Sequence, residues 1–117
     1  MKYGEFTDAM REVAKSTGIE AEMLFEEWYN TAPEDRLAEY RELPLGEGEV
    51  RNFAEDMATL FQKVIGFTDG EELCAERMKE GHSFLRAIYA KCVELGIDVG
   101  NIKIDVPLSP SDAMRMV

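Results

Sequence analysis

Two long stretches in the second half of the chain repeat their apolar residues at alternating three- and four-residue steps. In the first stretch these positions are Val50, Phe53, Met57, Leu60 and Val64, and in the second they are Cys74, Met78, Gly81, Leu85, Ile88, Cys92 and Leu95. This spacing places the residues on one face of a helix. Because only a short link separates the stretches, the sequence predicts a central antiparallel helical hairpin of residues 49–65 and 69–95.

Gly81 falls inside the apolar seam of the second predicted helix. A glycine inside a helix costs about 1 kcal/mol relative to alanine, so its presence needs a physical reason. The sequence predicts that Gly81 makes room for a large side chain from the facing helix, either Met57 or Phe53. The alternative is a kink near Gly81 and His82.

The first half of the chain predicts three further helices. Apolar residues recur at helical spacing in the first two, at Tyr3, Phe6, Met10, Val13 and Ala14, and then at Ala21, Leu24, Phe25 and Trp28. Gly18 ends the first helix, where a glycine can adopt the left-handed conformation of a C-cap. Pro33 suits the first turn of a short third helix.

The pattern changes after Gly100, where apolar and polar residues alternate over residues 102–106 as in an extended segment. Ser109-Pro110-Ser111-Asp112 then has the spacing that starts a helix, which predicts a short C-terminal helix over residues 113–117. The predicted fold class is all-α, with about five helices built around the hairpin. At 117 residues, without a linker long enough to divide it, the chain is predicted to be one domain, 1–117.

Negative charge is concentrated in one segment. The chain has a formal net charge of −11, and residues 20–49 contain ten acidic residues against two arginines. Such a surface repels phosphate backbones and anionic membranes and attracts basic partners. We therefore expect neither direct nucleic-acid binding nor membrane binding. The N-terminus has no apolar stretch resembling a signal peptide, so the expected location is the cytoplasm.

The segment from Val13 to Leu24 resembles the helix–turn–helix motif, with small residues at Ala14 and Gly18. In DNA-binding families the second helix of this motif reads the major groove with basic and amide side chains. Here that helix offers four glutamates and no lysine or arginine. We interpret the segment as an ordinary helical corner.

The all-α nucleotide pyrophosphohydrolases are also small, acidic and helical, and they resemble one another in E-x-x-E and E-x-x-D pairs that hold magnesium. In this chain Ala75 stands three residues after Glu72, and Lys79 stands three residues after Glu76, so these pairs are missing. His82 is the only histidine, which excludes a multi-histidine metal site within one chain. No cofactor is expected.

The two cysteines, Cys74 and Cys92, fall on the same predicted helix. At a rise of about 1.5 Å per residue their separation along the helix is far greater than a disulfide allows. We expect both to be small core residues.

Aromatic residues set among acidic ones have the composition of interface anchors. The leading hypothesis is therefore a non-enzymatic binding, inhibitor or adaptor module that engages a basic protein surface. One version is a nucleic-acid mimic that inhibits a nucleic-acid-binding protein. The candidate partner-binding residues are Glu22, Glu26, Glu27, Tyr29, Glu34, Asp35, Glu39 and Tyr40.

Two alternatives come from other functional classes. The first is a small all-α hydrolase whose metal is held by carboxylates from separate helices, an arrangement that sequence spacing does not reveal. The second is a helical structural subunit that adds residues 102–106 as a strand to another chain. A homodimer is compatible with any of these hypotheses.

Overall fold

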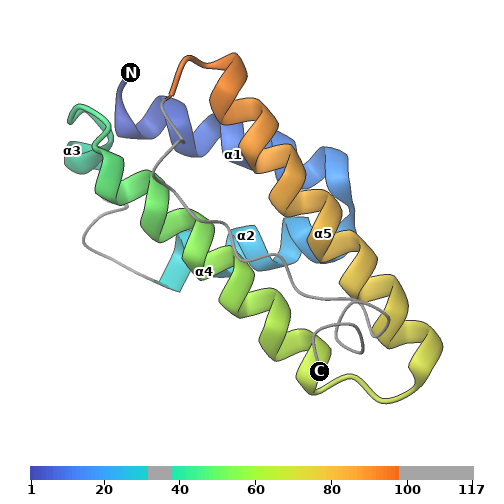
Figure 1. The fold of residues 1–117 in the computed structure, drawn as a ribbon. Helices are drawn as coiled ribbons and strands as arrows, with labels where there is room; N and C mark the ends of the chain where they lie inside the picture. Colours follow the sequence, from blue (N-terminus) through green and yellow to red (C-terminus); the bar gives the residue numbers. More distant parts are fainter. Residues whose placement is uncertain (32–37, 98–117) are drawn as a thin grey trace.

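The computed structural model of the chain describes residues 1–31 and 38–97, which contain five α-helices (Figure 1). The helices are α1 (Tyr3–Thr17), α2 (Ile19–Thr31), α3 (Ala38–Arg41), α4 (Glu47–Gly66) and α5 (Glu71–Glu94). No strand occurs within these two ranges, which confirms the all-α prediction. The start of the predicted third helix at Pro33, the extended segment and the C-terminal helix lie outside the described residues. None of the described helices is both long and apolar enough to cross a membrane.

Helices α4 and α5 pack against each other and are joined by residues 67–70 (Figure 1). A Cβ atom placed on Gly81 would lie 3.1 Å from Cδ1 of Phe61, so Gly81 does make room for a large side chain. The predicted neighbours of Gly81, Met57 and Phe53, were wrong. The first turn of α5 is exposed, and Gly81 lies beside Phe61, which is one helical turn nearer the link between the two helices than Met57. Helix α5 continues through Gly81 and His82 without a break.

An aromatic cluster joins α1, α2 and α4 at the centre of the core. The Phe53 ring centroid lies 4.9 Å from that of Trp28, 5.5 Å from that of Phe6 and 5.9 Å from that of Phe25, all in edge-to-face arrangements. Phe6, Phe25 and Phe53 are fully buried. This cluster positions α2 beside α4.

The N-terminus of α2 is capped by a side chain from α5. The Glu80 carboxylate accepts a hydrogen bond of 2.8 Å from the backbone N–H of Ala21. A Cβ atom on Gly18 would collide with this carboxylate. Gly18 has φ 164°, which is extended rather than left-handed, so the predicted reason for a glycine here was wrong. The glycine instead leaves room for the Glu80 carboxylate.

We expect Glu80→Ala to lower the free energy of unfolding by about 1 kcal/mol, because the N–H of Ala21 loses its acceptor at the start of a helix. Urea denaturation followed by circular dichroism would measure the change. Glu76→Ala is the matched control, since Glu76 is exposed one turn earlier on α5 and should cost less than about 0.5 kcal/mol. Equal losses in the two variants would show that the cap does not stabilise the fold.

The two cysteine thiols are both free, but their surroundings differ. Cys92 is buried and Cys74 is half-buried, so the expectation of two core cysteines holds only for Cys92. Burial also raises the pKa of the Cys92 thiol and disfavours the reactive thiolate. Under a thiol-alkylating reagent at neutral pH, we expect Cys74 to react first and Cys92 only when the fold opens. Mass spectrometry would follow both sites, and equal rates would contradict this assignment.

Candidate binding groove between α2 and α4

The structure describes six of the eight predicted partner-binding residues, and Glu34 and Asp35 lie outside the described residues. Glu22, Glu26 and Tyr29 are partly exposed on α2, where Glu27 is exposed, and Glu39 and Tyr40 lie on α3. Glu26, Tyr29 and Tyr40 take part in contacts within the chain. Of the six described residues, Glu27 and Tyr40 line the groove between α2 and α4 that we identify as the candidate site, with Tyr40 at one end.

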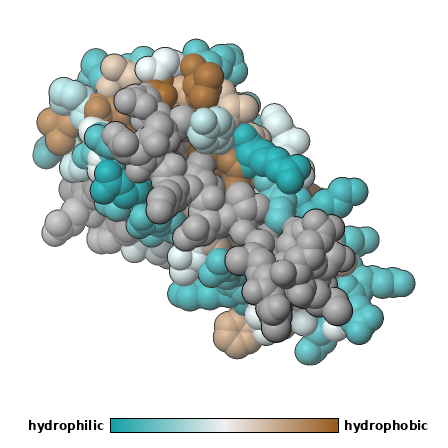
Figure 2. All heavy atoms as spheres, viewed as in Figure 1, coloured by the Kyte–Doolittle hydropathy of each residue, from teal (hydrophilic) through white to brown (hydrophobic). Residues whose placement is uncertain are grey.

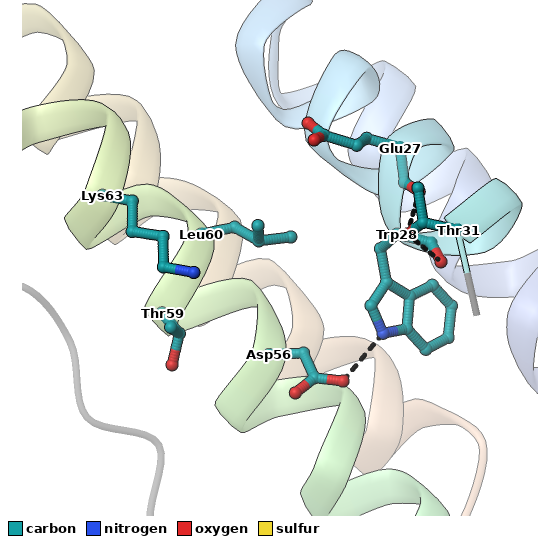
Figure 3. Close-up of a pocket in the computed structure, with 7 residues that line it drawn as sticks. All are labelled: Glu27, Trp28, Thr31, Asp56, Thr59, Leu60 and Lys63. Carbon is teal, nitrogen blue, oxygen red and sulfur yellow. Dashed lines mark hydrogen bonds between the residues drawn. The ribbon is translucent and has the colours of Figure 1, made fainter. Parts of the chain in front are cut away.

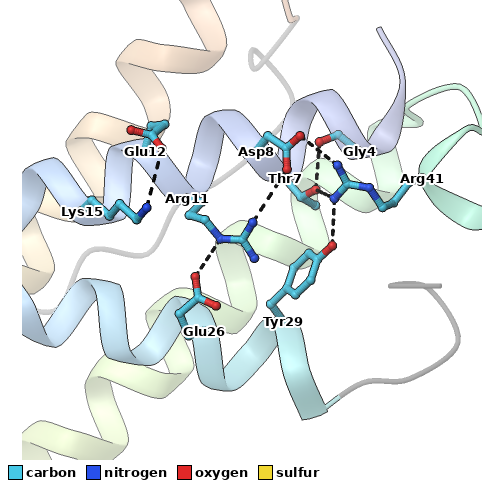
Figure 4. Close-up of polar contacts among 9 residues, drawn as sticks. All are labelled: Gly4, Thr7, Asp8, Arg11, Glu12, Lys15, Glu26, Tyr29 and Arg41. Atoms are coloured by element: carbon cyan, nitrogen blue, oxygen red, sulfur yellow. Dashed lines mark hydrogen bonds and ion pairs between the residues drawn. The ribbon is translucent and has the colours of Figure 1, made fainter. Parts of the chain in front are cut away.

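Two arginines hold Glu26 and Tyr29 on the side of α2 that faces α1 (Figure 4). Arg11 donates a hydrogen bond of 2.7 Å from Nε to Glu26, and its guanidinium lies 4.7 Å from the ring centroid of Tyr29. Arg41 donates hydrogen bonds of 2.8 Å to the Tyr29 hydroxyl and to Asp8. The hydrogen bonds to Asp8 and Tyr29 raise the pKa of Arg41 above its ordinary value. Glu26 and Tyr29 therefore join α1, α2 and α3.

Tyr40 connects α3 with the first turn of α4. Its hydroxyl donates a hydrogen bond of 2.9 Å to Oε1 of Glu49. Its ring lies edge-to-face against Tyr3, with the ring centroids 5.0 Å apart. Tyr40 is half-buried and stands at one end of the groove with Glu49.

The groove consists of three adjoining hollows along α2 and α4. The middle hollow, of about 190 Å³, lies between Glu27, Trp28 and Thr31 of α2 and residues 56–63 of α4 (Figure 3). It shares Trp28 and Asp56 with a hollow of about 420 Å³ at the Tyr40 end. It shares Glu27, Leu60 and Lys63 with a hollow of about 360 Å³ at the other end. The shared lining residues show that the three hollows adjoin one another along α2 and α4, and we refer to them together as the groove.

Trp28 and Asp56 meet across the groove. The indole N–H of Trp28 donates a hydrogen bond of 2.8 Å to Oδ2 of Asp56, as Figure 3 shows. Trp28 is only 7% exposed, whereas Asp56 is exposed, so the pair links the core to the groove wall. This contact fixes the orientation of the Asp56 carboxylate.

Of the residues that α4 contributes to the groove, the apolar Leu60 and Val64 belong to the predicted seam, but the polar ones were not predicted as site residues. Their signal was a polar stripe beside the apolar seam. The stripe recurs at three- and four-residue steps and consists of Glu49, Asn52, Asp56, Thr59 and Lys63. Such a stripe is typical of any solvent-facing helix. The position of the α4 stripe beside α2 in the structure was therefore needed to identify it as a wall of the groove.

The two ends of the groove differ in charge. Of the described residues that line the Tyr40 end, two are carboxylates, Glu49 and Asp56, and none is a lysine or arginine. The opposite end has an apolar lining formed by Leu24, Leu60, Val64 and Phe67, together with Glu20, Glu27, Lys63 and Arg77. Phe67 is 87% exposed. Arg77 donates a hydrogen bond of 2.6 Å to the Thr68 hydroxyl and lies 3.9 Å from Glu20. One end thus suits a cation and the other an apolar group.

No three side chains of histidine, cysteine, aspartate or glutamate cluster with metal-site geometry in the part of the chain that the structure describes. Comparisons with models of protein families, with characterised proteins and with solved structures find no match to this chain. The function is therefore inferred from the groove and its charges.

Proposed function

We propose that the groove between α2 and α4 binds a basic amphipathic helix of a partner protein, and that the chain is a non-enzymatic binding or inhibitor module. The observation that carries this proposal is the row of three adjoining hollows that form the groove, which combines apolar residues with carboxylates in a protein of net charge −11. An amphipathic helix binds such a groove by placing its apolar face inside and its charged residues along the rim.

The length of the groove suits a helix. Its lining extends from Gly48 near the start of α4 to Phe67 just after the end of α4, which corresponds to about 28 Å at the helical rise of about 1.5 Å per residue. That length accommodates about five turns of a partner helix. Leu60 is only partly buried and Phe67 is exposed, so both have apolar surface that a partner would remove from water.

Charge supports a basic partner rather than an acidic one. Three carboxylates in the groove, those of Glu27, Glu49 and Asp56, have no ion pair among the described residues. Of the two described cations in the lining, Arg77 is paired with Glu20, which leaves Lys63. On the one face that Figure 2 shows, hydrophilic and apolar side chains of the described residues lie beside one another. The net negative charge accelerates encounters with a basic partner, and the groove carboxylates select its orientation.

An inhibitory role follows if the partner uses the same basic helix to bind nucleic acid. Lysine and arginine side chains that contact phosphates in the free partner would instead contact carboxylates in the groove. The chain would then compete with nucleic acid for one surface.

The test is the affinity of a fluorescently labelled amphipathic lysine/leucine peptide of about 18 residues, a length at which helices form in water. Fluorescence anisotropy would compare the wild type with the double variant Glu27→Lys, Asp56→Lys. We expect the variant to bind at least about tenfold more weakly, a loss of about 1.4 kcal/mol. The signal of Trp28, the only tryptophan, should also change when the wild type binds.

The matched control is the double variant Glu72→Lys, Glu76→Lys, which changes the net charge equally on exposed positions of α5 outside the groove. Thermal melting of both variants would establish that they fold. Binding by the control should remain close to that of the wild type. An equal loss in both variants would show that the peptide responds only to net charge, and the proposal would be wrong.

A further inference from the structure

We infer that the partner helix carries a lysine or arginine and, about two helical turns away on the same face, a large apolar residue. This inference rests on the proposed function and specifies the partner that the groove recognises. It follows from the different chemistry of the two ends of the groove and from the distance between them.

The Tyr40 end is built to receive a cation. Oδ2 of Asp56 accepts the hydrogen bond from Trp28, and Oε1 of Glu49 accepts the one from Tyr40. Each aromatic donor thus holds a carboxylate in position. Oδ1 of Asp56 is the oxygen offered to a cationic donor, because Oε2 of Glu49 lies against Gly46. Carboxylates combined with aromatic rings bind ammonium and guanidinium groups well. The hollow of about 420 Å³ is large enough for the end of one such side chain.

The opposite end is built to receive an apolar side chain. Leu24, Leu60, Val64 and Phe67 contribute to its lining, and Phe67 is mostly exposed. In the same hollow the charges of Lys63 and Arg77 balance those of Glu20 and Glu27, so this end lacks the excess of carboxylates found among the described residues of the Tyr40 end. The two ends therefore select different residues of the partner.

The spacing comes from the helix that lines both ends. Asp56 and Val64 are eight residues apart on α4, which is about 12 Å along the helix axis. A partner helix that lies along α4 spans the same distance with residues seven or eight positions apart. Residues at this separation lie on one face of a helix.

The experiment uses two helical peptides of identical composition and about 18 residues. The matched peptide has one lysine seven residues from one leucine in an alanine- and glutamine-rich background. The shifted peptide has the same lysine moved by two positions, onto a different face of the helix. Each peptide is made with the lysine before the leucine and with the lysine after it. Calorimetry measures the binding of every peptide to the full chain, and the tighter of the two orientations represents each peptide in the comparison.

We expect the matched peptide to bind at least about tenfold more tightly than the shifted one. In Asp56→Asn, whose amide oxygen still accepts the indole hydrogen bond, this preference should disappear. Glu72→Gln, outside the groove, should retain it.

The outcomes separate this inference from the proposed function. If both peptides bind equally, and both are weakened by Glu27→Lys, Asp56→Lys, the groove binds basic helices without the inferred spacing, and the inference is overturned. If neither peptide responds to that double variant, the inference and the proposed function both fail.

Discussion

Replacing Phe53 by alanine is expected to lower the free energy of unfolding by about 3–5 kcal/mol, a large part of the stability of a domain this size. The Phe53 ring is 1% exposed and lies edge-to-face against Phe6, Phe25 and Trp28. Its removal would leave a cavity where α1, α2 and α4 meet. Because the flanking rings are held on two different helices, α1 and α2, they cannot all move to fill it.

Denaturant titration should monitor helix content and Trp28 fluorescence together, since Trp28 is a neighbour of the lost ring. Phe67→Ala is the matched control. It removes the same atoms from a side chain that is 87% exposed, directly after α4, and should cost less than about 0.5 kcal/mol. If the two variants lose similar stability, Phe53 is not the centre of the core.

The helices were predictable because their apolar residues repeat over many turns. In α4, for example, Val50, Phe53 and Met57 follow the three- and four-residue steps of a single buried face, and all three are buried. The contacts between helices were less predictable. Glu80 caps the N-terminus of α2 by accepting a hydrogen bond from Ala21, 59 residues away in the sequence, and no local sequence pattern predicts such a contact. The choice of Phe61 as the neighbour of Gly81 likewise depends on where the turn between α4 and α5 ends.

The residues of the candidate site could also be predicted only in part, because they depend on contacts between helices. Charge counting identified α2 as acidic, but it did not distinguish Glu26 from Glu27. Adjacent residues on a helix point about 100° apart, so their neighbours depend on tertiary packing. Glu26 pairs with Arg11 of α1, whereas Glu27 lines the groove against α4. Asp56 was missed because its partner, Trp28, belongs to another helix.

The second large effect is expected at Gly81, where leucine should lower the free energy of unfolding by about 3 kcal/mol. A Cβ atom at this position would already lie 3.1 Å from Cδ1 and 3.2 Å from Cγ of Phe61. Phe61 is fully buried and packs edge-to-face against Phe84, with the ring centroids 5.9 Å apart, so it has little room to move. A leucine would therefore force α4 and α5 apart. Denaturant titration would measure the loss.

Gly81→Ala tests the same contact with opposite expected signs in two backgrounds. In the wild type, crowding of Phe61 should outweigh the helix propensity of alanine and cost about 1 kcal/mol net. In a Phe61→Leu background the crowding is relieved, and the same change should stabilise the protein by up to about 1 kcal/mol. Gly66→Ala is the control, because a Cβ there meets no atom within 4 Å. A change of sign between the two backgrounds would show that residue 81 and Phe61 interact directly. If Gly81→Ala changes the stability in the same direction in both backgrounds, Phe61 is not the reason that a glycine is required at this position.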